Sequence, residues 1–135
     1  MLGSHLRRIL LAILTLFAAP SAGAGELSAP DALVQAKAGT VILVDLRTPG
    51  EWAQTGIAPG ASRADFNAGP DAFLADIQRI TGGDKSRPLA LICRSGNRSA
   101  RAAALLQRNG FTSISDVSEG MNGWLGRGLP TVPVQ

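Results

Sequence analysis

Two short, continuous apolar runs limit the fold of this chain more than any other feature. Residues 41–44 read Val-Ile-Leu-Val, and residues 89–92 read Leu-Ala-Leu-Ile. Runs so short and so uniformly apolar are typical of strands that are buried on both faces of a parallel sheet. Because such a sheet needs helices on both sides, the sequence predicts an α/β fold.

Helix and turn signals complete this pattern. Ser28, followed three residues later by Asp31, is an N-cap signal for a helix that ends before Gly39. Apolar residues recur at helical spacing after Pro70, and a Gly-Gly pair ends that segment. We expect helices at residues 28–37, 70–81 and 99–109 and around Trp124, a third strand at 113–117, and a turn-rich stretch at 48–60.

The first 24 residues have the features of a secretory signal peptide. Arg7 and Arg8 precede an apolar run of eleven residues (9–19), and residues 22–24, Ala-Gly-Ala, fit the small-x-small cleavage pattern. A transmembrane helix needs about 20 apolar residues, so we expect no stable membrane insertion. We predict general secretion rather than twin-arginine export, cleavage after Ala24, a periplasmic location and a single domain at residues 25–135.

The charge balance argues against a nucleic-acid partner. The full chain carries a formal charge of +3, but eleven basic and ten acidic residues remain once Arg7 and Arg8 are removed. No run of Lys and Arg with interleaved aromatic residues is left. The remaining charges are best interpreted as a solvated surface, and 45% hydrophobic residues suffice for a core.

Two residue types are informative because they are scarce. The single histidine, His5, lies in the predicted signal peptide, so the domain has no imidazole for Cys-His or Ser-His catalysis or for a His-containing zinc site. We therefore predict no metal. The single cysteine, Cys93, cannot form an intramolecular disulfide. In an oxidising compartment such a residue is either buried and inert or a functional thiol.

The residues around Cys93 favour the functional thiol. They connect the predicted strand 89–92 to a predicted helix, and the carboxyl end of a parallel strand is where ligands bind in open α/β sheets. Small residues at 95–97 allow successive N–H groups to form an anion-binding nest, and the helix N-terminus adds its own N–H groups. The loop reads Cys93-Arg94-Ser95-Gly96-Asn97-Arg98-Ser99. Together with the charges of Arg94 and Arg98, it predicts a thiolate with a pKa below the usual ~8.5.

Two further segments flank this loop along the chain. Upstream, residues 45–52 read Asp-Leu-Arg-Thr-Pro-Gly-Glu-Trp and residues 56–61 read Gly-Ile-Ala-Pro-Gly-Ala. Downstream, residues 119–124 read Glu-Gly-Met-Asn-Gly-Trp, followed by Gly-Leu-Pro at 128–130. The three segments, in this order, resemble the motifs of the rhodanese family. Ile57 stands where that family commonly has a histidine, which the family does not use as a catalytic base.

The resemblance implies a fold and a chemistry. The fold is a five-stranded parallel sheet flanked by helices on both faces. The chemistry is transfer of a sulfane sulfur from a small anionic donor such as thiosulfate, through a persulfide on Cys93, to cyanide, a small thiol or a protein thiol. In this scheme the N–H groups of residues 94–99 hold the persulfide, and Arg94 and Arg98 orient the donor. Sulfite leaves as a stable anion, and no cofactor is needed.

Several other residues have simpler interpretations. Asp45, Arg47 and Glu51, near a strand end, are expected to form a structural network of ion pairs and caps. Both tryptophans are expected in the core. Arg101 and Arg108, seven residues apart on one helix face, are interpreted as solvated, with docking of an acidic partner as the alternative.

Two rival functions share the same loop. Phosphatases and arsenate reductases also place a thiolate below an anion-binding loop, but their motif is C-x5-R, whereas Cys93 and Arg98 define a shorter C-x4-R. The second rival is a sulfur-relay or binding module that serves a protein partner without turnover. The sulfurtransferase hypothesis further predicts that the Cys93 sulfur lies at the floor of a shallow crevice.

Overall fold

A computed structural model of the chain describes residues 25–135, and the predicted signal peptide lies outside the described residues. The core is one five-stranded sheet in the order β1-β5-β4-β2-β3, and every neighbouring pair of strands is parallel. The strands are β1 (Gly25–Glu26), β2 (Ile42–Asp45), β3 (Ser62–Arg63), β4 (Leu89–Ile92) and β5 (Ile114–Asp116). The predicted α/β class and the five-stranded parallel sheet are therefore confirmed.

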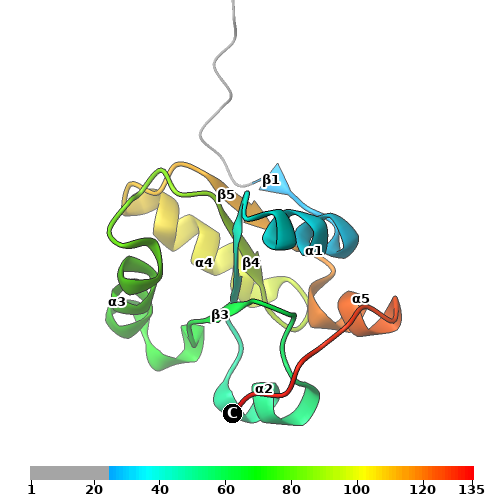
Figure 1. The fold of residues 1–135 in the computed structure, drawn as a ribbon. Helices are drawn as coiled ribbons and strands as arrows, with labels where there is room; N and C mark the ends of the chain where they lie inside the picture. The colour runs from blue at the N-terminus through cyan, green and yellow to red at the C-terminus, as the bar shows by residue number, and fades with distance from the viewer. Residues whose placement is uncertain (1–24) are drawn as a thin grey trace, which may run out of the picture.

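The helices cover both faces of this sheet (Figure 1). They are α1 (Ala29–Ala38), α2 (Pro49–Thr55), α3 (Pro70–Thr81), α4 (Asn97–Arg108) and α5 (Gly120–Gly126), with a short 3-10 turn, η1 (Phe66–Ala68). One hydrophobic cluster lies under α3 and α4 and includes Phe73, Ile77 and Leu106. A second lies under α1 and α5 and includes Trp124. No helix among the described residues is long and apolar enough to cross a membrane.

The central strands show why their sequences are uniformly apolar. Along β2, Leu43 belongs to the cluster under α1 and α5, whereas Val44 belongs to the cluster under α3 and α4. Along β4, Ala90 and Leu91 divide between the two clusters in the same way. Successive side chains of a strand point to opposite faces, so covering both faces disfavours polar residues, and the one polar residue of these two strands, Asp45, lies at the end of β2.

The segment predicted to be turn-rich, residues 48–60, contains helix α2, so this expectation was wrong. Thr48 and Glu51 form a reciprocal capping box at its N-terminus, and Pro49 occupies the first helical position. Proline is well suited to that position because an N–H there would have no intrahelical partner, so its absence costs no hydrogen bond. The prolines and glycines of this stretch favour turns, but the Thr-x-x-Glu spacing of Thr48 and Glu51 is a helix start signal.

Candidate active site

The sheet brings the start of the upstream segment and the Cys93 loop together at one edge. Strands β2 and β4 are neighbours, and Asp45 pairs in register with Ile92, the residue before Cys93. The N–H of Leu46 donates to the carbonyl of Ile92 at 2.8 Å. Because both strands are parallel, their carboxyl ends open on the same side. Asp45, Arg47 and the Cys93 loop therefore share this edge, as expected for a ligand site in an open α/β sheet.

The sulfur of Cys93 is enclosed by its own loop. Cys93 directly follows β4 and is 1% exposed. The N–H of Gly96 donates to the sulfur at 3.1 Å, and the thiol donates to the hydroxyl oxygen of Ser99 at 3.5 Å. That hydroxyl in turn donates to the carbonyl of Gly96 at 3.1 Å. A hydroxyl group rotates freely, so Ser99 can instead donate to the sulfur when Cys93 is a thiolate.

The loop favours the thiolate over the thiol. Burial raises the pKa of Cys93, but hydrogen bonds from the Ser99 hydroxyl and from the backbone N–H groups of Ser99, Ser95 and Gly96 outweigh it, so the pKa is lowered. Hydrogen bonds to the charged form stabilise it without any neighbouring base. The lowered pKa of Cys93 agrees with the thiolate that the loop sequence predicts. Of the six N–H groups of residues 94–99, those of Ser95, Gly96 and Ser99 contribute to the lowering.

Two glycines give the loop its shape. Gly96 has a φ of +94°, and a Cβ there would lie 2.5 Å from the carbonyl oxygen of Ser118. Gly120, at the start of α5, has a φ of +61°, and a Cβ there would meet the carbonyl oxygens of Arg94 and Cys93, the latter at 2.8 Å. Only glycine adopts this backbone while allowing so close an approach. Gly120 belongs to the downstream segment that resembles a rhodanese motif, but its contact with the Cys93 loop could not be predicted from the sequence.

Helix α5 holds the loop from the other side. The N–H of Met121 donates to the carbonyl of Cys93 at 2.8 Å, and the N–H of Asn122 donates to the carbonyl of Arg94 at 3.0 Å. Both groups lie in the first turn of α5, where N–H groups lack intrahelical partners. The close approach at Gly120 makes these bonds reachable, so the downstream motif supports the loop through its backbone.

Asp45 and Arg47 form the buried ion pair that the sequence predicts. Their side chains are 0% and 2% exposed and meet at 2.8 Å. Asp45 also accepts from the indole N–H of Trp52 at 3.0 Å, while Arg47 donates to the Thr55 hydroxyl at 2.7 Å and the Gly56 carbonyl at 2.9 Å. A buried ion pair is stable only when its remaining groups are satisfied, and this network satisfies them.

Glu51 and Arg98 form a second, bidentate pair that the sequence analysis did not predict. The two oxygens of Glu51 accept from the guanidinium at 2.6 and 2.8 Å and so join α2 to α4. This contact with Arg98 lowers the pKa of Glu51 to about 2 and raises the pKa of Arg98. Glu51 is thus ionised throughout the physiological range and offsets much of the Arg98 charge.

A hollow of about 360 Å³ opens beside the loop. Its lining comes from β2–α2 and from the Cys93 loop and α5: Arg47, Glu51, Gln54, Thr55, Arg94, Met121, Asn122 and Leu125. Cys93 is 1% exposed and is not part of this lining, so the expectation that its sulfur forms the floor of the crevice is not confirmed. The sulfur lies beneath the surface, directly before Arg94 in the chain. The other loop residues, Ser95 and Asn97, are exposed.

Asp116, at the end of β5, is a neighbour of the site that the sequence analysis missed. Its Oδ1 is the one buried side-chain polar atom without a hydrogen-bond partner among residues 25–135. Burial raises the pKa of Asp116, the carboxylate of Glu26 raises it further, and the Ser99 hydroxyl opposes both. The described residues contain no group of three or more His, Cys, Asp and Glu side chains that could hold a metal ion.

Comparison with known proteins agrees with this geometry. Residues 28–127 match the rhodanese-like domain family. A sulfurtransferase of Allochromatium vinosum is 36% identical, and the match covers 68% of this chain and 78% of that protein. The thiosulfate sulfurtransferase GlpE of Pseudomonas entomophila is 30% identical, and the match covers 70% of this chain and 80% of that protein. A solved Rhodopseudomonas palustris protein of unknown function, described as a "possible tyrosine phosphatase", is 28% identical, with a TM-score of 0.68 and coverage of 81% of this chain and 85% of its own. This chain belongs to the family of rhodanese-like domains.

Proposed function

We propose that this protein transfers a sulfane sulfur from thiosulfate or a related donor to cyanide or a thiol, through a persulfide on Cys93. The observation that carries the proposal is the loop around the sulfur: the N–H of Gly96 and the hydroxyl of Ser99 contact it at 3.1 and 3.5 Å, and hydrogen bonding within the loop lowers the pKa of Cys93 despite its burial. The same groups that stabilise a thiolate stabilise the terminal sulfur anion of a persulfide. Sulfurtransferases among the relatives of this chain support the same reaction class.

The first step forms the persulfide. The Cys93 thiolate attacks the outer sulfur of thiosulfate, and a new S–S bond forms between the two. The S–S bond of thiosulfate breaks, and sulfite leaves with the bonding electron pair. No proton moves in this step, because the nucleophile and the leaving group are both stable anions. The absence of histidine from residues 25–135 is therefore compatible with the reaction.

The second step discharges the sulfur. Cyanide or a thiolate attacks the outer sulfur of the persulfide and forms a new C–S or S–S bond. The bond between that sulfur and Cys93 breaks, and its electron pair returns to Cys93. The regenerated thiolate is held again by the N–H of Gly96 and the hydroxyl of Ser99. The cycle needs neither a metal nor a cofactor.

The two arginines of the loop contribute differently to anion recognition. Arg94 lines the hollow and has no acidic partner within 4.0 Å among residues 25–135, so its charge is available to a donor. Arg98 is already engaged by Glu51. Since Cys93 is 1% exposed, the donor has to bring its outer sulfur below the surface of the hollow. A narrow, terminal sulfur such as that of thiosulfate satisfies this condition.

The same geometry bears on the phosphatase and sulfur-relay functions. In a phosphatase the loop arginine has to bind a tetrahedral oxyanion, whereas both terminal nitrogens of Arg98 donate to Glu51. The sulfur-relay function uses the same persulfide and differs only in turnover, with a protein thiol as the acceptor. The apolar run at residues 9–19 and the cleavage pattern at 22–24 support a periplasmic location.

A turnover assay tests the proposal. Thiocyanate production from thiosulfate and cyanide is measured for the mature wild type and for Cys93→Ser, with an aryl phosphate offered in parallel. Wild-type turnover that is lost in Cys93→Ser supports sulfur transfer. Hydrolysis of the aryl phosphate without thiocyanate production would contradict it. If sulfur loads on Cys93 but only a protein thiol discharges it, the relay function replaces the enzyme.

A further inference from the structure

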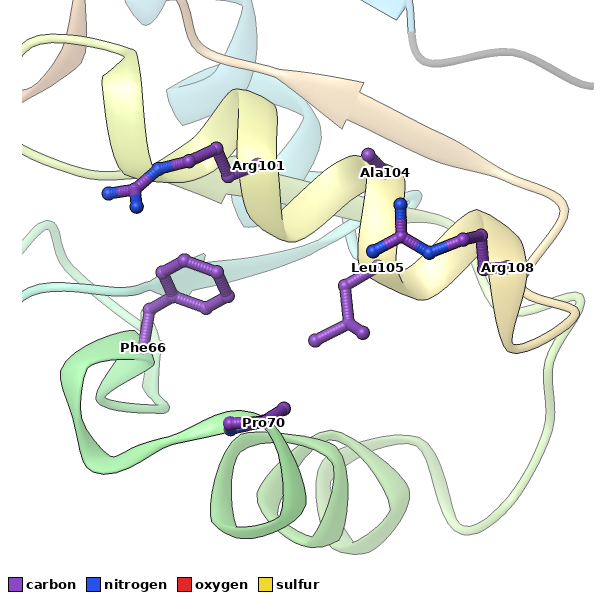
Figure 2. A pocket seen from close by; sticks show the side chains of 6 residues that line it. All are labelled: Phe66, Pro70, Arg101, Ala104, Leu105 and Arg108. Carbon is purple, nitrogen blue, oxygen red and sulfur yellow. The ribbon is translucent and has the colours of Figure 1, made fainter.

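A second hollow, of about 450 Å³, lies on the opposite flank of α4 from the sheet and shares no lining residue with the hollow beside Cys93. It is formed where η1 and the start of α3 approach α4 (Figure 2). Its lining residues are Phe66, Pro70, Arg101, Ala104, Leu105 and Arg108. None of them takes part in the proposed sulfur transfer, so the hollow needs its own explanation.

The floor of this hollow is apolar and fixed in place. Phe66 and Leu105 are half-buried and pack on the hydrophobic cluster under α3 and α4. The ring of Phe66 also meets Phe73 edge to face, with centroids 5.2 Å apart and planes at 87°. Pro70 is exposed at the opposite wall. Apolar surface that is held rigidly and left in contact with water favours covering by another apolar group.

Two arginines stand at the ends of the floor. Arg101 and Arg108 are both exposed, and their seven-residue separation corresponds to about 10.5 Å along a helix axis. The guanidinium of Arg101 lies over the Phe66 ring, 5.6 Å from its centroid. In Figure 2 the guanidinium of Arg108 reaches back over Leu105. The hollow therefore combines an apolar floor with two positive charges, one beside Phe66 and one beside Leu105.

The charges of Arg101 and Arg108 are not balanced by a carboxylate, a property they share with Arg63, Arg87 and Arg94 among residues 25–135. Carboxylates pair with Arg47, Arg79, Arg98 and Arg127. Within residues 25–135, neither arginine of the hollow has an acidic group within 4.0 Å. The lining contains no Asp or Glu. A complementary occupant therefore brings its own carboxylates.

We propose that this hollow docks an acidic amphipathic helix of a partner protein. In an α-helix, carboxylates at positions i and i+7 lie on one face with the same spacing of about 10.5 Å as the two arginines. Leucines at i+3 and i+4 of that helix fall between the carboxylates and reach the floor at Phe66 and Leu105. The proposal concerns a docking surface and does not depend on the proposed sulfur transfer.

The test uses a fluorescently labelled helical peptide of about 15 residues, with Glu at i and i+7 and Leu at i+3 and i+4. Binding to the mature protein is measured by fluorescence anisotropy. A control peptide carries Gln in place of both Glu residues. We expect the Glu peptide to bind about tenfold more tightly than the Gln peptide, and the difference to shrink at high salt because exposed charges are screened.

A pair of matched variants locates the site. Arg101→Glu with Arg108→Glu should weaken the Glu peptide about tenfold and should bind a peptide with Lys in place of both Glu residues. The control, Arg79→Glu with Arg87→Glu, makes the same change in net charge at exposed residues outside the hollow and should leave binding unchanged. Circular dichroism verifies that both variants fold. Equal weakening in both variants, equal binding of the Glu and Gln peptides, or no binding of the Glu peptide would overturn the proposal.

Discussion

The carboxylate of Glu51 grips the guanidinium of Arg98 with two hydrogen bonds, of 2.6 and 2.8 Å, across a sequence separation of 47 residues. The pair joins the helix that follows β2 to the helix that follows the Cys93 loop. It is also the contact that limits how much positive charge the loop offers to a donor. Breaking the pair should change both the stability of the protein and its affinity for an anionic donor.

Glu51→Gln should destabilise the protein in a pH-dependent way. The pKa of Glu51 falls from its ordinary 4.5 to about 2 on folding, so the stabilisation is fully present above about pH 4.5 and disappears as the pH falls towards 2. We expect the free energy of unfolding to fall by about 1–3 kcal/mol at neutral pH, a value already reduced for the partial exposure of the pair. Urea unfolding across this pH range measures this change.

The control is Asp76→Asn, which breaks an exposed pair with Arg79 and should lower the free energy of unfolding by less than about 0.5 kcal/mol. A loss of stability in Glu51→Gln that does not depend on pH would contradict the role given to the Glu51 carboxylate.

The same substitution should strengthen recognition of an anionic donor. With glutamine at position 51, the charge of Arg98 is no longer offset beside the hollow. The KM for thiosulfate should fall about threefold to tenfold, as expected for one additional charge near a doubly charged ligand. Steady-state kinetics at neutral pH and low salt provide the measurement, with Asp76→Asn as the control that frees a distant arginine. An unchanged or raised KM would show that Arg98 has no influence on donor binding.

Ser99→Ala should raise the pKa of Cys93. The Ser99 hydroxyl makes the largest of the contributions that lower this pKa. Without the hydroxyl, fewer hydrogen bonds oppose the effect of burial, which raises the pKa. Thiolate absorbance in the ultraviolet, followed as a function of pH and corrected with Cys93→Ser, gives the value. Ser95→Ala is the matched control, because Ser95 acts through its backbone N–H, which alanine retains. Equal pKa values in Ser99→Ala and the wild type would contradict the role given to the hydroxyl.

Gly120→Ala should damage the Cys93 loop. The added Cβ would meet the carbonyl oxygens of Arg94 and Cys93 in a backbone conformation that alanine disfavours. We expect a loss of about 2 kcal/mol or more in unfolding free energy and a large fall in sulfur loading. Gly126→Ala, in the same helix, has open space at its Cβ position and should retain both properties. If Gly120→Ala behaves like Gly126→Ala, the close packing of α5 on the loop is not what positions Cys93.

The sequence predicts the central sheet well because coverage on both faces leaves a local signature. Strands β2 and β4 are apolar at nearly every position for that reason. The edge strands β1 and β3 have only two residues each. They lack such a signature, since their pairing depends on the register with β5 and β2 rather than on their own composition.

The features of the site were likewise predictable where they are local in the sequence and not predictable where they depend on packing. The Cys93 loop was predictable because its nucleophile, small residues and helix start are contiguous in the sequence. The Asp45–Arg47 pair was predictable because its members are two residues apart. The Glu51–Arg98 pair, the contact at Gly120 and the position of Asp116 beside Ser99 were not, because each depends on how separate helices and strands pack.

Intact mass spectrometry of the mature protein after treatment with thiosulfate tests the persulfide on Cys93 most directly. The wild type should gain the mass of one sulfur atom, Cys93→Ser should gain none, and addition of cyanide should remove the sulfur as thiocyanate is formed. A wild type that gains no sulfur from thiosulfate or from a polysulfide, or a Cys93→Ser variant that gains as much, would contradict the proposed function.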